Sequence, residues 1–194
     1  MAVVLAIKSS PRAGGNTDML IDEAAAGARE AGHEVVVLAL RDHKFSGCTN
    51  CGGCARTGRC HVNDAMQEIF PLLERAEHVI LASPMFFMDV TWIAKAMIDR
   101  CQVFWARQYV LHTGSGRQKP GGNLIALLAG GTNFKTLFTA PTIVLRAWAA
   151  SLDLKLHVGL TLRRIDQKGD ILKHPDALAR ARELGRIVAA LNTP

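Results

Sequence analysis

The chain contains no apolar run that approaches the roughly 20 residues needed to cross a membrane. Its first residues, MAVVLAIKSSPR, have neither a basic lead-in nor a small-residue cleavage site, so they predict a buried strand rather than a signal peptide. Aromatic residues are few, at 6%, but apolar residues reach 49% and no long polar tract interrupts them. This composition favours a globular protein over a disordered one. We expect a cytoplasmic protein with no membrane partner.

What the chain does have is a concentration of cysteine. Four of its five cysteines stand in the stretch CTNCGGCARTGRC, at the spacing C-x2-C-x2-C-x5-C: Cys48, Cys51, Cys54 and Cys60. A [4Fe–4S] cluster offers four irons, each of which takes one thiolate, and two-residue gaps let a tight loop reach three of them. Small residues between the cysteines let the backbone turn and approach the sulfides closely. The pattern favours one cluster bound by these four thiolates.

Two other uses of these thiols stay open. Zinc sites usually split their ligands into two distant pairs, which suits this run less well, and the cysteines could also be redox-active or metal-free thiols. Structural disulfides are less expected, because the cytoplasm is reducing. Cys101 stands alone in a predicted helix and is interpreted as a small apolar core residue. We expect His61 to be an exposed loop residue, whereas a hydrogen bond from His43 to a cluster sulfur is a further alternative.

Apolar strands and helices alternate along the chain. Five strands are predicted, over residues 2–8, 34–40, 77–83, 123–129 and 153–161, the last of them more edge-like. Helices are predicted over residues 17–31, 64–76, 90–109, 141–151 and 175–192. Asp64 and Gln67 stand at capping-box spacing, and Pro71 should kink its helix or end the regular portion of it. The pattern predicts an α/β protein: one domain over residues 1–194 with a flavodoxin-like, doubly wound, five-stranded parallel sheet. A cysteine-rich loop, residues 41–62, is inserted after the second strand.

A turn-rich segment joins the first strand to the first helix. Residues 9–17, SSPRAGGNT, supply hydroxyls, glycines and backbone N–H groups, and the helix N-terminus adds a positive field that suits a phosphate monoester. The segment is neither a Walker loop nor G-x-G-x-x-G, so a dinucleotide bound by that fingerprint is not expected. On composition alone, an ordinary turn capped by Asn16 or Thr17 is an equally good interpretation.

Two blocks of residues resemble the motifs of a known family. Residues 10–17, SPRAGGNT, are similar to the S-P-R-x-x-G-N-T phosphate loop of the NADPH-dependent FMN reductase-like flavoproteins. SPMFF at residues 83–87 and KAMIDR at residues 95–100 resemble their S-P-x-Y-x…K-A-x-x-D-R block. With the cysteine spacing added, the chain resembles the iron–sulfur flavoproteins of that superfamily. The resemblance covers residues 2–131 by motif and the remainder by strand and helix order only.

The resemblance implies FMN, with its phosphate bound by residues of the first block and its ring lined by residues of the second, chiefly through backbone amides. The residues implied are Ser10, Arg12, Asn16 and Thr17 for the phosphate, and Pro84, Met85, Phe86 and Phe87 for the ring. Phe86 stands where the family commonly has Tyr, so any role of that hydroxyl is absent. No catalytic residue is assigned. The family also implies a homodimer or homotetramer, for which the apolar residues 85–88 offer a contact surface.

These features predict an FMN-dependent oxidoreductase that carries a [4Fe–4S] cluster. Electrons would pass from a one-electron donor such as ferredoxin, through FMN, to a small-molecule acceptor, because flavin can take two electrons whereas a cluster passes one. The alternatives are an NAD(P)H-dependent FMN or quinone reductase without a cluster, a non-catalytic electron carrier, and a zinc-stabilised binding module.

The charge balance does not change this interpretation. Lys and Arg number 23 against 17 Asp and Glu, a formal net charge of +6, but apart from residues 117–119 and 163–164 the basic residues are scattered. No nucleic-acid motif accompanies them, so no nucleic-acid partner is predicted. A basic face helps to dock an acidic donor such as a ferredoxin, although a merely solvated surface is the commoner use of such charges.

Overall fold

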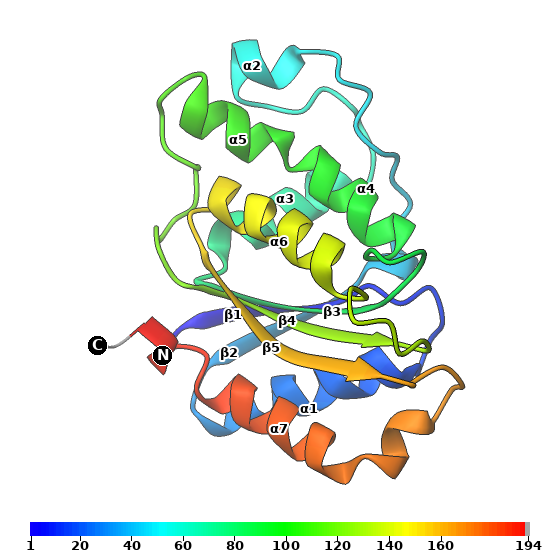
Figure 1. Cartoon of the computed structure of the whole chain (residues 1–194). Coiled ribbons are helices and arrows are strands. Elements are labelled where there is room, and N and C mark those ends of the chain that lie inside the picture. Colours follow the sequence, from blue (N-terminus) through cyan, green and yellow to red (C-terminus); the bar gives the residue numbers. More distant parts are fainter. Residues whose placement is uncertain (193–194) are drawn as a thin grey trace.

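Five parallel strands form one sheet in the computed structural model, which describes residues 1–192 (Figure 1). The strands are β1 (Val3–Lys8), β2 (Glu34–Ala39), β3 (His78–Pro84), β4 (Asn123–Gly130) and β5 (Lys155–Arg163). They lie in the order β2-β1-β3-β4-β5, and every neighbouring pair is parallel. The predicted flavodoxin-like sheet is therefore confirmed. Its switch point lies between β1 and β3, where ligands bind in such sheets.

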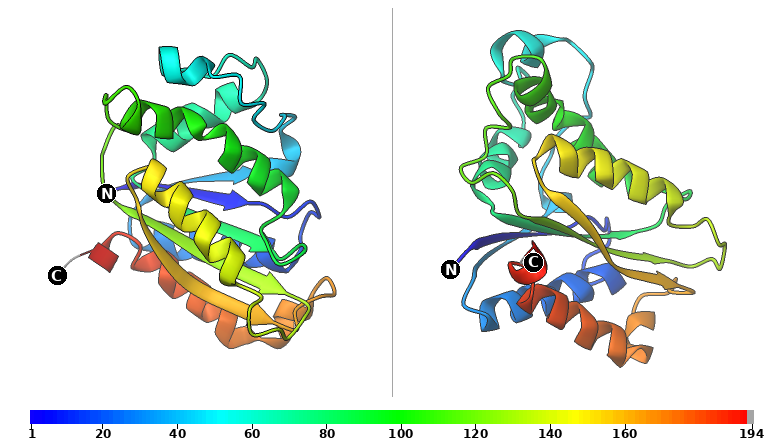
Figure 2. Two further views of the ribbon diagram at one scale, coloured as in Figure 1. Left: turned by 45° about the horizontal axis from the view of Figure 1, so that its top comes forward. Right: turned by 60° about the vertical axis from the view of Figure 1, so that its left-hand side comes forward.

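Helices cover both faces of the sheet (Figure 2). The longer helices are α1 (Asn16–Glu30), α3 (Met66–Arg75), α4 (Trp92–Arg100), α5 (Gln102–Tyr109), α6 (Thr139–Ser151) and α7 (Pro175–Arg186). The short ones are α2 (Gly53–Thr57) and the 3-10 turns η1 (Leu40–Asp42), η2 (Asp170–Lys173) and η3 (Ala190–Asn192). Helices α1 and α7 lie on one face, and α3 to α6 lie on the other. None of the helices within residues 1–192 has the length and apolar character to cross a bilayer.

Each face of the sheet has its own hydrophobic core, because successive side chains of a strand point to opposite faces. Leu5 and Ile7 of β1 belong to the core under α3 to α6, whereas Val4 and Ala6 belong to the core under α1 and α7. The central strands β3 and β4 are buried along almost their whole length. Strand β2 is an edge strand with partly exposed residues, which its apolar sequence did not indicate.

Two predicted helices differ from the observed ones. The single helix expected over residues 90–109 is two helices, α4 and α5, which meet at Cys101. The Cys101 N–H donates to both the Met97 and the Ile98 carbonyls, a shared bond typical of helix ends, and no proline or glycine marks the break in the sequence. The last helix ends at Arg186 rather than near residue 192 and is followed by the turn η3. Pro71 lies inside α3, as expected.

Candidate functional site

A pocket opens at the carboxyl end of the sheet, and we call it the strand-end pocket. Its lining residues lie at or after the ends of β1, β3, β4 and β5. They are Ser10, Pro11, Arg12, Gly15, Asn16, Thr17, Pro84, Met85, Phe86, Ala129, Gly130, Gly131, Ile165, Asp166 and Lys168. The pocket thus brings together seven of the eight residues implied by the family resemblance. The exception is Phe87.

The segment between β1 and α1, residues 9–17, is held by its own hydrogen bonds. The Ser10 hydroxyl accepts from the Arg12 N–H at 3.1 Å, and the Gly14 N–H donates to the Asp18 carboxylate at 2.9 Å. Asp18 is buried and paired with Arg41 at 3.0 Å, and Arg41 also donates to the Ser10 carbonyl. The first amides of α1 have no partner inside the helix, so they stay available to an anion.

Asn16 uses its side chain within the protein. Its Nδ2 donates to the Gln167 carbonyl at 2.8 Å, and its Oδ1 accepts from the N–H groups of Gly169 and Ile171. The N-cap residue of α1 is Gly15, and no side chain forms a hydrogen bond to cap the helix. The alternative interpretation, in which Asn16 or Thr17 is the cap residue, is therefore wrong. Asn16 instead ties the start of α1 to the connection between β5 and η2.

That connection was missed by the sequence analysis. Ile165, Asp166 and Lys168 close one side of the strand-end pocket, and Lys168 Nζ donates to the Ala13 carbonyl at 3.0 Å. No motif surrounds these residues. The one available signal was their place at the carboxyl end of a parallel strand, where binding residues gather.

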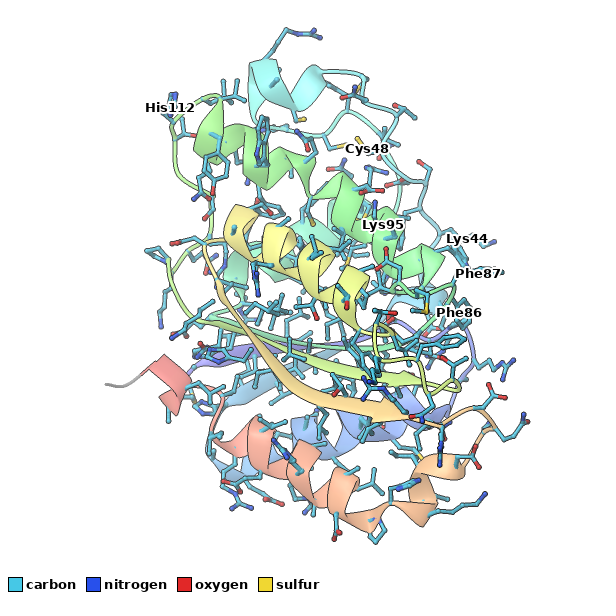
Figure 3. The ribbon with its side chains drawn as sticks, viewed as in Figure 1. Lys44, Cys48, Phe86, Phe87, Lys95 and His112 are labelled. Carbon is cyan, nitrogen blue, oxygen red and sulfur yellow. The ribbon has the colours of Figure 1, made fainter. Side chains whose placement is uncertain are left out.

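The turn after β3 has an unusual backbone. Phe86 and Asp89 exchange two backbone hydrogen bonds, and the residues between them, Phe87 and Met88, have φ of +48° and +67°. Turns of this kind normally use glycine or asparagine, and a bulky residue at positive φ costs about 1–3 kcal/mol. Phe87 is fully exposed at the tip of the turn and does not line the pocket. Figure 3 labels Phe86 and Phe87 at the same edge of the molecule.

Thr91 joins this turn to the segment after β1. Its hydroxyl donates to the Ser9 carbonyl at 2.8 Å and accepts from the Ala94 N–H, which caps α4. The Thr91 N–H donates in turn to the Ser83 hydroxyl at 3.2 Å. All three of Ser9, Ser83 and Thr91 are buried. The two loops that line the strand-end pocket are therefore fixed relative to each other.

The four clustered cysteines line a second cavity, of about 220 Å³, which we call the cysteine cavity. It is far larger than the ~10–15 Å³ that holds one water molecule. Its lining residues are Cys48, Thr49, Asn50, Cys51, Gly52, Cys54, Ala55, Cys60, Val62, Arg100, Gln102, Val103 and Trp105. Asn50 and Gly52 have positive φ, so the backbone turns at the predicted small residues.

The thiols of this cavity affect one another. Burial raises the pKa of Cys54, and the neighbouring Cys48, Cys60 and Cys51 raise it further, because adjacent thiolates repel. Cys48 and Cys51 are exposed, while Cys54 and Cys60 are partly buried. Within residues 1–192, no three His, Cys, Asp or Glu side chains form a group that could bind a single metal ion.

Neither histidine near the cysteines lines the cavity. His61 is exposed, as expected, and packs over Gly53, where an added Cβ would lie 1.9 Å from the histidine ring. His43 lies 3.8 Å from a carboxylate oxygen of Glu68. The fifth cysteine, Cys101, is 1% exposed and also stays outside the cysteine cavity. Burial raises the pKa of Cys101 to about 12, so its thiol stays protonated at neutral pH.

We predict a clear difference in thiol reactivity in the folded protein without metal. Iodoacetamide at pH 8 should label Cys48 and Cys51 within minutes and leave Cys101 unmodified, since the thiolate is the nucleophile. Mass spectrometry of peptides from treated protein measures the labelling, and denatured protein is the control in which all five cysteines react. Labelling of native Cys101 at the rate of Cys48 would contradict its buried position.

A buried ion pair lies beside the cysteine cavity. Arg100 donates to both oxygens of Asp64, at 2.7 and 3.1 Å, and its side chain is 1% exposed. Burial alone would raise the pKa of Asp64, but hydrogen bonds from Arg100 and from the N–H groups of Ser46 and Met66 outweigh it and lower that pKa. Asp64 thus caps α3. Gln67 donates to the Cys60 and Val62 carbonyls instead of completing the predicted capping box.

The strand order and the strand-end pocket define an α/β protein of the flavodoxin-like class. Residues 2–140 match the family model described as NADPH-dependent FMN reductase. The chain is 32% identical over 142 residues to an iron–sulfur flavoprotein of Archaeoglobus fulgidus, a match that covers 73% of this chain and 61% of that protein. It is 35% identical over 97 residues to an iron–sulfur flavoprotein of Methanocaldococcus jannaschii, which covers 50% of each.

The chain therefore belongs to the NADPH-dependent FMN reductase family, and the family predicted from its motifs is confirmed. An FMN-dependent oxidoreductase is the enzyme class of that family, as the motifs implied. The matches span 61% and 50% of the lengths of the two relatives.

Solved structures share the fold. An NAD(P)H:quinone oxidoreductase from Methanothermobacter marburgensis superposes with a TM-score of 0.68 at 19% identity, over 95% of this chain and 98% of its own. A flavone reductase superposes with a TM-score of 0.71 at 20% identity, over 97% of this chain and 62% of its own. At these identities the likeness concerns the fold alone.

Proposed function

We propose that this chain, as one domain over residues 1–194, is an FMN-dependent oxidoreductase whose four clustered cysteines bind a [4Fe–4S] cluster. The observation that carries the proposal is that all four cysteines line one cavity, at the end of α4 that lies away from the strand-end pocket. Their order along one loop fits the ligand pattern of a four-iron cluster. Relatives at 27–35% identity are themselves named iron–sulfur flavoproteins, which supports the same assignment.

The residues of the strand-end pocket fit FMN. The free amides at the start of α1 and the Thr17 hydroxyl suit a phosphate, and Arg12 adds positive charge. The Ser10 hydroxyl, which donates to the Arg12 carbonyl, would shape the segment around the phosphate. Pro84, Met85 and Phe86 would line the ring. When bound, FMN supplies two-electron chemistry, and these residues orient it and exclude water from it. Asn16 would act by holding the connection between β5 and η2 against the phosphate-binding segment, because its side chain is already committed there.

Helix α4 relates the two sites. Its N-cap residue, Thr91, fixes both loops of the strand-end pocket, and its last residue, Arg100, lines the cysteine cavity. A helix of nine residues is about 13 Å long, so one rigid element sets the separation of the two sites. A cluster in the cysteine cavity would pass electrons singly between a donor such as ferredoxin and the flavin. The flavin would then reduce a small-molecule acceptor.

Metal and flavin analysis of anaerobically purified protein tests this proposal. We expect about four irons, four acid-labile sulfides and one FMN per chain after reconstitution. Stopped-flow reduction should be faster with reduced ferredoxin than with NADPH. Protein that binds FMN but takes up no iron would overturn the cluster assignment and leave the flavin assignment intact.

The second candidate is an NAD(P)H-dependent FMN or quinone reductase with no cluster. Two observations favour it: the description of the matching family model, and the exposure of Cys48 and Cys51, which suits reactive thiols. This enzyme would be reduced rapidly by NADPH with full FMN and no iron. The same two measurements therefore separate the candidates.

We also propose that the chain forms a homodimer or homotetramer through the surface beside the strand-end pocket. Phe86 and Phe87 are 42% and fully exposed, and Trp92 at the start of α4 is 64% exposed. Exposed apolar groups of this size often mark interfaces. We expect sedimentation at micromolar concentration to show a dimer or tetramer, and Phe87→Asp to shift it towards monomer. Leu172→Asp is the matched control, since Leu172 is 63% exposed on the 3-10 turn η2. A monomeric wild type would end the proposal.

A further inference from the structure

Arg100 holds both ends of the cysteine segment, residues 48–60. Its Nη1 donates to the Ser46 carbonyl at 3.1 Å and its Nη2 donates to the Val62 carbonyl at 3.3 Å, while both nitrogens bind Asp64. Ser46 precedes Cys48 by two residues, and Val62 follows Cys60 by two. Asp64 adds to this arrangement by accepting from the Ser46 N–H at 3.1 Å. One planar guanidinium therefore joins the entry and the exit of the segment.

One nitrogen of the guanidinium has no partner. Among the described residues, Arg100 Nε is a buried polar atom that makes no hydrogen bond, although the other two nitrogens are fully used. Leaving a buried donor of a charged group unsatisfied is costly, and such atoms call for a missing acceptor. Arg100 is also the one charged residue that lines the cysteine cavity in the part of the chain described. The cysteine cavity is thus lined by a residue that has an unused N–H donor.

We propose that Arg100 is a positioning residue of the cysteine cavity, whose Nε–H donates to a sulfur of the group bound by the four cysteines. This inference rests on the proposed cluster. A sulfur atom of the cluster, or the Sγ of a ligating cysteine such as Cys60, is the acceptor that the donor lacks. The guanidinium fork fixes the ends of the segment, and the remaining N–H points its positive hydrogen at sulfur.

A donor of this kind has two consequences. Hydrogen bonds to the sulfurs of a cluster stabilise the more negative, reduced state, and they raise the reduction potential. Partners behind the ligands also hold them in place, and losing one typically lowers metal affinity 10- to 100-fold. Asp64 balances the charge of Arg100. The cluster would therefore gain a directed hydrogen bond from Nε–H rather than a net positive charge beside it.

The test compares Arg100→Met and Arg100→Lys with the matched control Arg107→Met. Arg107 also holds the cysteine segment, through Nε to the Gly58 carbonyl at 2.7 Å and an ion pair with Glu74, but it does not line the cysteine cavity. The readouts are the cluster potential, followed by electron paramagnetic resonance during an anaerobic redox titration, and the rate of iron loss to a chelator. Lysine keeps the charge without the fork or the Nε–H.

We expect Arg100→Met to lower the potential and to release iron about 10- to 100-fold faster, with Arg100→Lys intermediate and Arg107→Met close to wild type. Because Arg100→Met leaves Asp64 unpaired, the double variant Arg100→Met/Asp64→Asn serves as the folded reference, with thermal unfolding and FMN content as checks.

A wild-type potential and iron-release rate in this double variant would overturn the proposal. Equal shifts in Arg100→Met and Arg107→Met would also overturn it, because they would show only a loosened loop. A wild type that binds FMN but no iron would overturn it together with the proposed cluster.

Discussion

Replacing any one of the four cysteines that line the cysteine cavity with serine is expected to remove most iron and sulfide from anaerobically reconstituted protein. Each thiolate of a four-iron cluster holds one corner, so the loss of a ligand leaves an iron open to water and makes the cluster labile. The replacements are Cys48→Ser, Cys51→Ser, Cys54→Ser and Cys60→Ser, each measured for iron, sulfide and visible absorption. FMN content should stay at the wild-type level, because the strand-end pocket contains none of these residues.

Cys101→Ser is the matched control for this series. The same substitution is made at a buried site outside the cysteine cavity, so iron and sulfide should stay near wild type. The new hydroxyl is buried among apolar side chains, so a small loss of thermal stability is expected instead. Full iron in any loop variant would count against that ligand, and loss of iron in Cys101→Ser alone would reverse the assignment.

The second large effect is expected at the strand-end pocket. Thr17→Val removes one hydroxyl with little change of volume, and a hydrogen bond to a charged group contributes about 1.5–3 kcal/mol. FMN affinity should therefore fall roughly 10- to 100-fold, since 1.4 kcal/mol corresponds to a factor of ten. Fluorescence titration of the apoprotein with FMN measures the change. Thr142→Val on α6 is the control, because the Thr142 hydroxyl bonds the Phe138 carbonyl away from the pocket.

Asn16→Ala tests a different aspect of the same pocket. It removes three hydrogen bonds to residues 167–171, so the wall that contains Asp166 and Lys168 should loosen. We expect FMN affinity and thermal stability to fall together, whereas Thr17→Val should lower affinity alone. If Asn16→Ala and Thr17→Val together kept wild-type FMN affinity, the pocket would not be the phosphate site.

Much of this protein can be predicted from local patterns. The order of apolar strands and helices determined a parallel sheet, because strands buried on both faces leave nearly unbroken apolar runs. The seven motif residues that meet in the strand-end pocket lie at or after the ends of β1 and β3, which are neighbours at the switch point of such a sheet. The spacing of Cys48, Cys51, Cys54 and Cys60 likewise placed them on one loop, where they share a cavity.

Tertiary structure decided the rest, because the interactions concerned join residues that are far apart in the sequence. Asn16 stands in a phosphate-binding motif, yet its side chain bonds residues more than 150 positions away, and no local pattern carries that information. The pairing of Arg100 with Asp64 depends on how α4 packs against the end of the cysteine loop. Phe87 shares a motif with Pro84 and Met85 but leaves the pocket, because the turn gives it a positive φ. The sequence by itself determined the parallel sheet, the two loops and the cysteine set, because these depend on local patterns. Packing alone decided which side chains face the pocket, which hold the loops, and which buried donor is left without a partner.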